Sequence, residues 1–344
     1  MPRSVCEPRT WLSRRAGHEA ARGARGTVTA RVAVIVNPVA GSRGRRTAGH
    51  PRAALARAIL AETGVAGDVH GTAGPGEAEA LARAAHEAGS TLVVAWGGDG
   101  TVNEVVRALA FGPTALGLVR AGSGNGLARA LGIPTDPAAA LRTALTGAER
   151  PIDLGELGGR LFVSVAGLGL DAAVAAGFNA RGAGRRGVWP YIRLALEALA
   201  TTPARSYTLE VDGVRRDTRA LLVACANGPQ YGSGARIAPQ ARLDDGWLDL
   251  VVVEDRPALA RLAAGGRLLT GTLASAPGVW TAAFTRLEVT AAPPLAFHVD
   301  GEVVQSGPHL VARVHPGALR VRGGALLVDR SRAGVSRPRV SRWR

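Results

Sequence analysis

Lysine is absent from this chain of 344 residues, and all 42 of its Lys and Arg residues are arginine. Three mechanisms need a side-chain amine and are therefore excluded: the P-loop lysine that clamps phosphates, the strand lysine of protein kinases, and the Schiff-base lysine of aldolases and pyridoxal-phosphate enzymes. Genomic base composition accounts for most of this bias, since the chain is also rich in alanine and glycine. A phosphate site in this chain has to be built without lysine.

Cysteine, aromatic residues and long apolar runs are scarce as well. Cys6 and Cys225 form neither a disulfide framework nor a CxxC metal motif, which fits a reduced cytosol. No apolar run reaches the roughly 18 residues of a membrane-spanning helix, and the first 30 residues lack the apolar core of a signal peptide. Aromatic residues make up 4% and do not alternate with basic ones, so we expect no nucleic-acid partner.

Positive charge is concentrated at the two ends of a chain whose net charge is +15. Residues 1–31 hold seven Arg against two Glu, and residues 329–344 hold six Arg against one Asp, which gives each end +5. Such tails could bind anionic headgroups at a membrane surface. The alternative is that residues 1–30 and 329–344 are solvated, disordered termini.

The first half of the chain alternates apolar runs with helical spacing. We expect strands at Arg31–Val36, Thr91–Trp96 and Ala115–Val119, and helices at Ala53–Glu62, Glu77–Ala88, Val102–Ala110 and Leu127–Leu131. Continuous β-branched runs are typical of parallel strands buried on both faces. Residues 31–150 are therefore predicted to form an α/β domain on a parallel sheet.

From Ile152 onward, short strands separated by turns replace this pattern. We expect strands at Leu161–Val165, Tyr207–Val211, Leu221–Ala226, Leu248–Val253, Leu287–Thr290, Ala296–Val299, Leu310–Val314 and Leu319–Val321, and helices at Tyr191–Ala200 and Ala258–Leu269. This series of short strands and turns predicts a β-rich antiparallel sandwich over residues 151–328, with the boundary between the two domains at Glu149–Pro151. A ligand cleft is expected between the two domains.

Three glycine-rich loops each follow a predicted parallel strand: Asn37–Gly41, Gly97–Thr101 and Ala121–Gly126. Loops at the carboxyl ends of parallel strands share one edge of the sheet. Glycine lets backbone N–H groups approach a phosphate closely, and a helix N-terminus adds positive potential. One such loop is most often only a turn, but three on successive strands predict a cradle for nucleotide phosphates.

Asp99 stands between two glycines in the second loop. A carboxylate there can hold Mg²⁺ on a triphosphate or accept a proton from an attacking hydroxyl. It can also cap the helix that begins near Val102. Glu104, one helical turn along, is expected to orient the loop by bonding its backbone.

In order and approximate spacing, these loops resemble the catalytic domain of the diacylglycerol kinase and sphingosine kinase superfamily of bacterial and other lipid kinases. The resemblance covers about residues 30–325 and rests on Asn37-Pro-x-x-Gly41, Gly97-Gly-Asp-Gly-Thr-x-x-Glu104, Gly122-Ser-Gly-Asn-x-Leu-Ala128, Ile152-Asp-Leu-Gly155, Gly167-Leu-Gly-Leu-Asp171, Ile237-Ala-Pro-x-Ala241, Asp244-Asp-Gly-x-Leu248 and Val299-Asp-Gly-Glu302. The set is specific, whereas Gly-Gly-Asp-Gly-Thr alone is shared with NAD kinases and phosphofructokinases.

The resemblance implies an α/β domain of the NAD kinase and diacylglycerol kinase type, a β sandwich, and the use of ATP and Mg²⁺. It implies ATP contacts at Asn37, Gly41, Gly97, Gly98, Gly100, Thr101, Gly122, Ser123, Asn125 and Glu302. Asp300 is the implied general base for the lipid hydroxyl, with Asp99 at the phosphates or as the alternative base. Taken alone, an Asp-Gly pair is a hairpin turn, as in Val211-Asp-Gly-Val214.

Further roles follow from the same resemblance. Asp171 is the implied lipid-headgroup residue, unless it only caps a helix. Three arginines in a loop broken by glycine could neutralise the transferring phosphoryl group, or belong to a solvated loop: Arg181, Arg185 and Arg186. Asp245 and the Leu248 carbonyl are the implied structural Mg²⁺ ligands, and a plain hairpin is the competing interpretation. Seven scattered His residues without zinc-site spacing disfavour zinc.

The third loop departs from one branch of the superfamily. Bacterial diacylglycerol kinases often have Asn-Asp-Phe-Ala there, whereas this chain has Asn125-Gly-Leu-Ala128. The loop is closer to the sphingosine kinase form, so the choice between diacylglycerol and a sphingoid or long-chain base stays open.

The sequence thus predicts an ATP-dependent kinase that phosphorylates a hydroxyl of a membrane lipid. A cytoplasmic protein bound peripherally to the inner face of the membrane is expected, and a homodimer is an open arrangement. The alternatives are an NAD-kinase-like phosphotransferase for a soluble hydroxyl and a non-catalytic nucleotide- or lipid-binding protein. The acidic positions speak against a decayed site, because all are present: Asp99, Glu104, Asp245, Asp300 and Glu302.

Overall fold

The computed structural model describes residues 31–41, 49–170, 202–231, 235–292, 296–305 and 307–324. Within these ranges the elements are β1 (Val32–Val36), α1 (Gly49–Thr63), β2 (Gly67–Gly71), α2 (Glu77–Glu87), β3 (Leu92–Gly97), α3 (Asp99–Leu109), β4 (Ala115–Arg120), α4 (Gly126–Ala130), α5 (Pro137–Thr146), β5 (Glu149–Leu157), β6 (Arg160–Phe162), β7 (Val165–Gly169), β8 (Arg205–Val211), β9 (Val214–Ala226), β10 (Leu248–Glu254), α8 (Ala258–Thr270), a 3-10 turn (Leu273–Ser275), β11 (Val279–Phe284), β12 (Arg286–Ala291), β13 (Ala296–Val299), β14 (Glu302–Gln305) and β15 (His309–Arg322). The predicted helix Tyr191–Ala200 lies outside the described residues.

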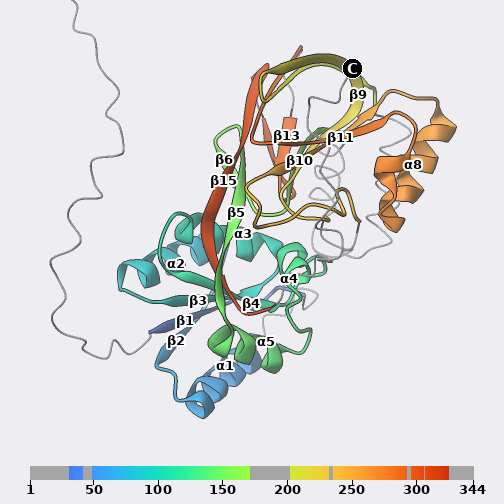
Figure 1. Cartoon of the computed structure of the whole chain (residues 1–344). Helices are drawn as coiled ribbons and strands as arrows, with labels where there is room; N and C mark the ends of the chain where they lie inside the picture. Colours follow the sequence, from blue (N-terminus) through green and yellow to red (C-terminus); the bar gives the residue numbers. More distant parts are fainter. Residues whose placement is uncertain are drawn as a thin grey trace, which may run out of the picture.

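The first part of the chain is a parallel sheet in the order β2-β1-β3-β4. Helices α1 and α5 pack together on one face, and α2 and α3 pack together on the other (Figure 1). The β1 and β3 side chains are buried along their whole length, as continuous apolar runs covered on both faces require. The predicted parallel α/β part is confirmed.

Two elements of this part escaped the sequence prediction. Strand β2 is an edge strand with the sequence Gly-Asp-Val-His-Gly, and none of its residues is fully buried, so it shows no apolar run. Helix α5 carries a clear start signal, because Asp136 accepts a hydrogen bond from the Ala139 N–H at 2.7 Å and Pro137 opens the helix.

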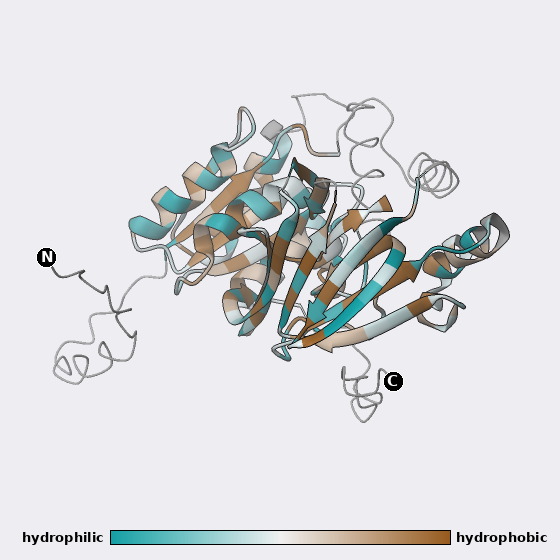
Figure 2. Ribbon diagram, turned by 90° about the horizontal axis from the view of Figure 1, so that it is seen from above, coloured by the Kyte–Doolittle hydropathy of each residue, from teal (hydrophilic) through white to brown (hydrophobic). Residues whose placement is uncertain are grey.

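The second part is antiparallel, and its strands follow the order β14-β13-β7-β9-β8-β12-β15, with β10 bridging β9 and β11. Strands β8 and β12 alternate between buried and exposed residues. Figure 2 shows brown hydrophobic and teal hydrophilic segments along the strands of the molecule. Large side chains such as Phe162, Tyr207 and Phe284 fill one core, while Leu222, Ile237 and Leu273 belong to another. The predicted β-rich antiparallel domain is confirmed.

Strands β5 and β15 connect the two parts. They run antiparallel side by side through the middle of the molecule (Figure 1), and the end of β15 pairs parallel with β4 through Val321 and Leu116. The sequence predicts two strands here, at Leu310–Val314 and Leu319–Val321. They form one strand of 14 residues whose register with β5 shifts between His315 and Leu319. The last strand of the described residues therefore completes the first sheet.

In the part of the chain that the structure describes, no helix has the length and apolar character needed to cross a bilayer.

Candidate active site

The three glycine-rich loops meet at the carboxyl edge of the parallel sheet. The Asn37 side-chain Nδ2 donates to the Thr101 hydroxyl at 2.9 Å, which ties the first loop to the second. Its Oδ1 accepts the Val39 N–H at 3.0 Å and so shapes its own loop. The partly buried Arg52 of α1 donates to the carbonyl oxygens of Asn37 and Ala40 at 2.8 and 2.7 Å, and its burial lowers the guanidinium pKa.

Glycine is required where these loops touch. A Cβ on Gly122 would lie 2.8 Å from the Cα of Gly98, and a Cβ on Gly41, whose φ is +69°, would overlap the Ala121 carbonyl oxygen. A Cβ on Gly100, in contrast, would have no atom within 4 Å. The second and third loops are thus in backbone contact, while the space above Gly100 is open.

Asp99 joins the second loop to the third. Its carboxylate accepts the N–H groups of Asn125 and Gly126 at 2.9 and 2.7 Å, so it caps the start of α4. The expectation that Asp99 caps the helix beginning near Val102 is wrong. That helix, α3, begins at Asp99 itself and has no side-chain capping bond. Since the first N–H groups of any α-helix lack an intrahelical acceptor, α3 offers N–H donors beside this carboxylate.

Asn125 adopts a left-handed backbone conformation with φ 55° and is almost fully buried. Its Oδ1 accepts the Gly122 N–H at 3.0 Å, and its Nδ2 donates to the Gly122 carbonyl at 2.5 Å. The side chain therefore closes the third loop on itself. Ser123, by contrast, is exposed at the rim of this loop.

Glu104 acts on a loop that the sequence prediction did not consider. Its carboxylate accepts the N–H groups of Gly76 and Ala78, both at 3.0 Å, at the start of α2. It therefore orients the loop after β2 rather than its own. That loop leaves the sheet where the Thr72 N–H donates to the Val36 carbonyl at 3.0 Å, so a fourth loop borders the site. It was missed because β2 itself shows no strand pattern.

Asp300 occupies the turn between β13 and β14. Its carboxylate accepts three backbone N–H groups, from Val163, Ser164 and Val165, at 2.7, 2.9 and 3.1 Å. These bonds explain why the predicted strand Leu161–Val165 is interrupted between β6 and β7: its N–H groups turn to the carboxylate instead of a neighbouring strand.

Burial raises the pKa of Asp300 to about 6, and the three N–H bonds oppose this rise. The negative charge of Asp99 is a smaller contribution to the same rise. The carboxylates of the α/β part and the sandwich part are therefore close enough to interact.

Glu302 makes a contact across the two parts of the molecule. Its carboxylate lies 3.6 Å from an NH group of Arg107 on α3, and Arg107 also binds Glu79 of α2 at 2.9 Å. Burial is the largest single effect on the Arg107 pKa and lowers it, but hydrogen bonding to Glu79 and the charges of Glu302, Glu79 and Glu104 together raise this pKa. The assignment of Glu302 to ATP stays a prediction, and Arg107 was not foreseen.

A buried aspartate forms a hydrogen bond to the loop in which a metal site was predicted. Asp153, 3% exposed, accepts the N–H groups of Gly246 and Gly317 at 2.7 and 2.8 Å. In the loop itself, the Asp245 carboxylate accepts the Trp247 N–H at 3.3 Å, and Leu248 begins β10. No cluster of three or more His, Cys, Asp or Glu side chains with the geometry of a metal cage occurs among the described residues. The Asp245 and Leu248 assignment stays a prediction.

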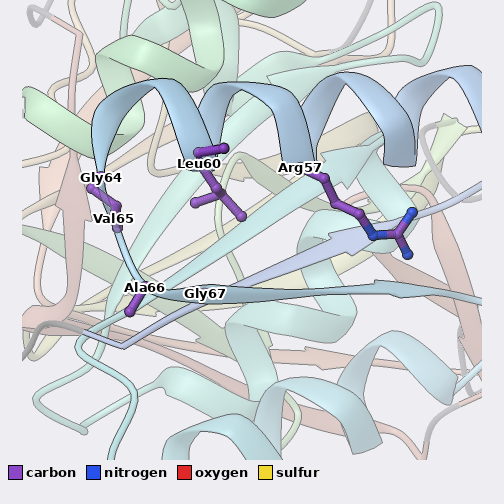
Figure 3. A pocket seen from close by; sticks show the side chains of 7 residues that line it. Arg57, Leu60, Gly64, Val65, Ala66 and Gly67 are labelled. Carbon is purple, nitrogen blue, oxygen red and sulfur yellow. The ribbon is translucent and has the colours of Figure 1, made fainter.

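Four predicted residues lie outside the described residues: Asp171, Arg181, Arg185 and Arg186. A depression of about 400 Å³ lies elsewhere, between the end of α1 and the start of β2, and is lined by Arg57, Leu60 and Gly67 among others (Figure 3). Because parallel strands start at this edge, it is opposite the glycine-rich loops. It has no part in the site.

The residues present fit a nucleotide and a hard cation. The backbone contact between Gly98 and Gly122 and the open space at Gly100 leave room where side chains would fill a phosphate cradle. Mg²⁺ is usually held by one or two carboxylates together with substrate phosphates, so Asp99 does not need a protein-only cage. Asp99 and the loop N–H groups are thus the residues that would hold Mg²⁺ and the triphosphate.

Comparison with known proteins identifies the family. Residues 31–157 match the diacylglycerol kinase catalytic domain, and residues 164–323 match the YegS C-terminal NAD kinase beta sandwich-like domain. A Pseudomonas aeruginosa protein named "Probable lipid kinase YegS-like" is 35% identical over 80% of this chain and 91% of its own length. The chain belongs to the YegS-like lipid kinase family. The predicted membership of the lipid-kinase superfamily is confirmed.

More distant relatives agree with this membership. The diacylglycerol kinase of Bacillus subtilis is 29% identical over 70% of this chain and 80% of its own length. The crystal structure of a diacylglycerol kinase from Bacillus anthracis superposes with a TM-score of 0.69 over 87% of this chain and 98% of that one. Its sequence identity is 20%, so this likeness concerns the fold.

Proposed function

We propose that this member of the family transfers the γ-phosphoryl group of ATP to a hydroxyl group of a membrane lipid. One observation carries the proposal: Asp300 of the sandwich part, whose carboxylate is held by three backbone N–H groups, lies within range of the charge of Asp99, which joins two of the glycine-rich loops. Two carboxylates near N–H donors suit a reaction that moves a proton and a phosphoryl group between two bound substrates.

The α/β part binds the phosphates in this proposal. The N–H groups that open α3 and the backbone of the Gly98 and Gly122 loops donate to phosphate oxygens, and Asp99 keeps the third loop in place through Asn125 and Gly126. Bound Mg²⁺ supplies neutralisation of the phosphate charge. Without lysine, these backbone dipoles provide the positive potential. Three predicted arginines would add to it: Arg181, Arg185 and Arg186.

The sandwich part provides the base. Asp300 takes the proton of the lipid hydroxyl, whose oxygen forms the new bond to the γ-phosphorus while the bond from that phosphorus to the bridging oxygen of ADP breaks. With a pKa raised to about 6, Asp300 is ionised at neutral pH and basic enough to accept a proton. The three N–H bonds hold it in one orientation.

A lipid acceptor requires contact with a bilayer surface. We place this contact, as a proposal, at the arginine-rich ends of the chain, which carry +5 each and would be attracted to anionic lipid. Vesicle co-sedimentation tests it: a chain trimmed to residues 31–328 should lose binding to vesicles that contain phosphatidylglycerol. Unchanged binding would remove the tails from the proposal.

The decisive experiment is transfer of labelled phosphate from Mg-ATP to diacylglycerol, sphingosine, ceramide and undecaprenol in mixed micelles. Labelling of one lipid, strongly lowered in the variants Asp99→Asn and Asp300→Asn, supports the proposal and selects the acceptor. Labelling of NAD⁺ alone would replace it with a soluble acceptor. ATP binding without transfer to any of these acceptors would contradict it.

The nucleotide cradle has its own matched pair of variants. Gly122→Ala should raise the KM for ATP strongly, because its Cβ would lie 2.8 Å from the Gly98 backbone. Gly100→Ala places a methyl group where no protein atom lies within 4 Å. It should therefore leave the fold intact and affect only what binds above it. Equal thermal stability with a changed KM in Gly100→Ala would place ATP at that spot.

A further inference from the structure

A buried asparagine lies directly behind the segment that holds Asp300. Asn227 follows the last residue of β9 and has no exposed surface. Its Nδ2 donates to two carbonyl oxygens, that of Val163 at 2.8 Å and that of Asp153 at 2.9 Å. The next carbonyl, that of Ser164, accepts the backbone N–H groups of Asn227 and Gly228 at 2.9 and 3.0 Å.

The same peptide units therefore have partners on both sides. The unit that joins Val163 to Ser164 has its carbonyl on Asn227 and its N–H on Asp300, and the next unit repeats this arrangement. Because a trans peptide is planar and its C=O and N–H point in opposite directions, fixing the carbonyl fixes the direction of the N–H. Asn227 thereby sets the direction of two of the three bonds that hold the carboxylate, one through its side chain and one through its backbone N–H.

In this orientation the side-chain amide of Asn227 leaves its own oxygen, the buried Oδ1, without a hydrogen-bond donor among the described residues. An unsatisfied buried acceptor is unfavourable, and most such atoms in proteins have a partner. The reversed amide would place its oxygen against the carbonyl oxygens of Val163 and Asp153. The observed orientation therefore serves the two carbonyls.

We infer that Asn227 is a positioning residue for the proposed base: it holds the backbone of Val163–Val165 so that the carboxylate of Asp300 stays aimed at the acceptor hydroxyl. Asn227 does not itself contact the reacting atoms in this inference. It acts through the peptide units at residues 163–165, and the inference rests on the function proposed above. The residue was not singled out from the sequence, because an Ala-Asn-Gly run after a strand is typical of an ordinary turn.

The test compares Asn227→Ala and the milder Asn227→Ser, which keeps one hydroxyl donor, with a control that also loses buried hydrogen bonds. Thr114→Ala is that control: Thr114 is 2% exposed, donates to the Ser90 carbonyl at 2.8 Å and lies at the amino end of β4, away from the site. Asn227→Ala should lower kcat by about tenfold to 100-fold, the expected effect of a misplaced reacting group. The KM for ATP should stay unchanged, Asn227→Ser should be intermediate, and Thr114→Ala should keep its kcat.

A double variant separates positioning from general loss of stability. In the Asp300→Asn background, Asn227→Ala should cause no further fall in kcat, because the group that it positions is gone. An equal fall in both backgrounds, or a fall matched by Thr114→Ala at equal melting temperature, would overturn the inference while leaving the kinase proposal intact.

Hydrogen exchange tests the contact even if the enzyme phosphorylates no lipid. The amide of Ser164, whose peptide unit loses the bond from the Asn227 side chain, should exchange faster in Asn227→Ala than in Thr114→Ala, whereas amides within β9 should not differ between the two variants. Unchanged protection at Ser164 would overturn the inference by itself. An inactive wild type with the expected exchange pattern would overturn the proposed function but keep Asn227 as the holder of this segment.

Discussion

Two hairpins of the sandwich part have nearly the same turn. Asp300-Gly301 joins β13 to β14, and Asp212-Gly213 joins β8 to β9. Both aspartates have φ 46°, and the glycines have φ 89° and 85°, as type I′ turns require. The resemblance extends to the carboxylates, because Asp212 accepts the Thr285 N–H, the Thr285 hydroxyl and the Arg286 N–H at 3.1, 2.9 and 2.9 Å.

The two turns differ in what lies opposite them. Asp212 is exposed, whereas Asp300 is partly buried and is affected by the charge of Asp99 from the other part of the molecule. Its neighbour Glu302 also binds Arg107 of α3, while the corresponding residue of the other hairpin is Val214. The comparison teaches that an Asp-Gly pair specifies a turn, and that its position in the tertiary structure specifies whether the aspartate can do chemistry.

The largest expected difference comes from the matched variants Asp300→Asn and Asp212→Asn. Asn-Gly suits a type I′ turn as well as Asp-Gly does, so both hairpins should persist. Asp300→Asn should lower kcat by about 100-fold to 10,000-fold, the usual contribution of a general base, and Asp212→Asn should leave it unchanged. Steady-state phosphate transfer measures both. Equal activity of the two variants would erase the distinction between the hairpins.

The dependence of kcat on pH should show where Asp300 becomes protonated. A protonated carboxylate cannot accept the hydroxyl proton, so kcat should be high above the pKa of about 6 and fall as the pH drops through it. Removing the negative charge in Asp99→Asn should lower the Asp300 pKa and move this fall in kcat to lower pH. Residual transfer, or a carbon NMR titration of the Asp300 carboxyl, measures the shift. If the acidic fall in kcat moved to higher pH in Asp99→Asn, the assigned effect of the Asp99 charge on Asp300 would be contradicted.

Arg107→Gln should have a smaller effect. The Arg107 and Glu302 side chains are 34% and 45% exposed, and ion pairs of that exposure contribute about 0.2–1 kcal/mol. If the pair steadies the Asp300 hairpin, kcat should fall by about twofold to fivefold. High salt, which screens the same ion pair, should lower the kcat of the wild type by a similar factor. Arg142→Gln, which breaks the exposed pair with Glu62 at 2.7 Å, is the control and should not affect kcat.

The smallest effect is expected when the Asp212-Gly213 hairpin is given the glutamate that follows Asp300-Gly301. Val214→Glu creates an Asp-Gly-Glu turn at an exposed position, so the fold should tolerate it. In the Asp300→Asn background it should restore no phosphate transfer, because neither Asp99 nor Arg107 interacts with that hairpin in any contact that the structure describes. Recovered activity would show that the motif suffices without its surroundings.

Much of the fold could be predicted because its signals are local. Strands β1, β3 and β4 are continuous apolar runs, and the start of α2 and the end of α8 fall within two residues of the predicted positions. Strand β2 has no such run, and the interruption at Val163–Ser164 depends on Asp300, more than 130 positions away. Elements that owe their form to distant partners were the ones missed or misplaced.

The candidate site divides in the same way. Glycines in three loops could be identified from the sequence, because their spacing after strands is a local pattern. The partners of Asp99, Glu104 and Asn227 could not, since each binds backbone groups of another loop. The expected cap of α3 by Asp99 was wrong for this reason: local proximity favoured its own helix, but the packed loops place the N–H groups of Asn125 and Gly126 nearer.

The sequence by itself determined the turns, the buried parallel strands, the lysine-free glycine-rich loops and the family. These depend on backbone conformations and apolar patterns that a few neighbouring residues specify. Only the tertiary structure decided that the charge of Asp99 reaches Asp300, that Arg107 joins α3 to Glu302, and that Asn227 supports the segment behind the proposed base. Hydrogen bonds and charges act over a few ångströms of space, and the packing of the two parts of the molecule sets which residues come within that range.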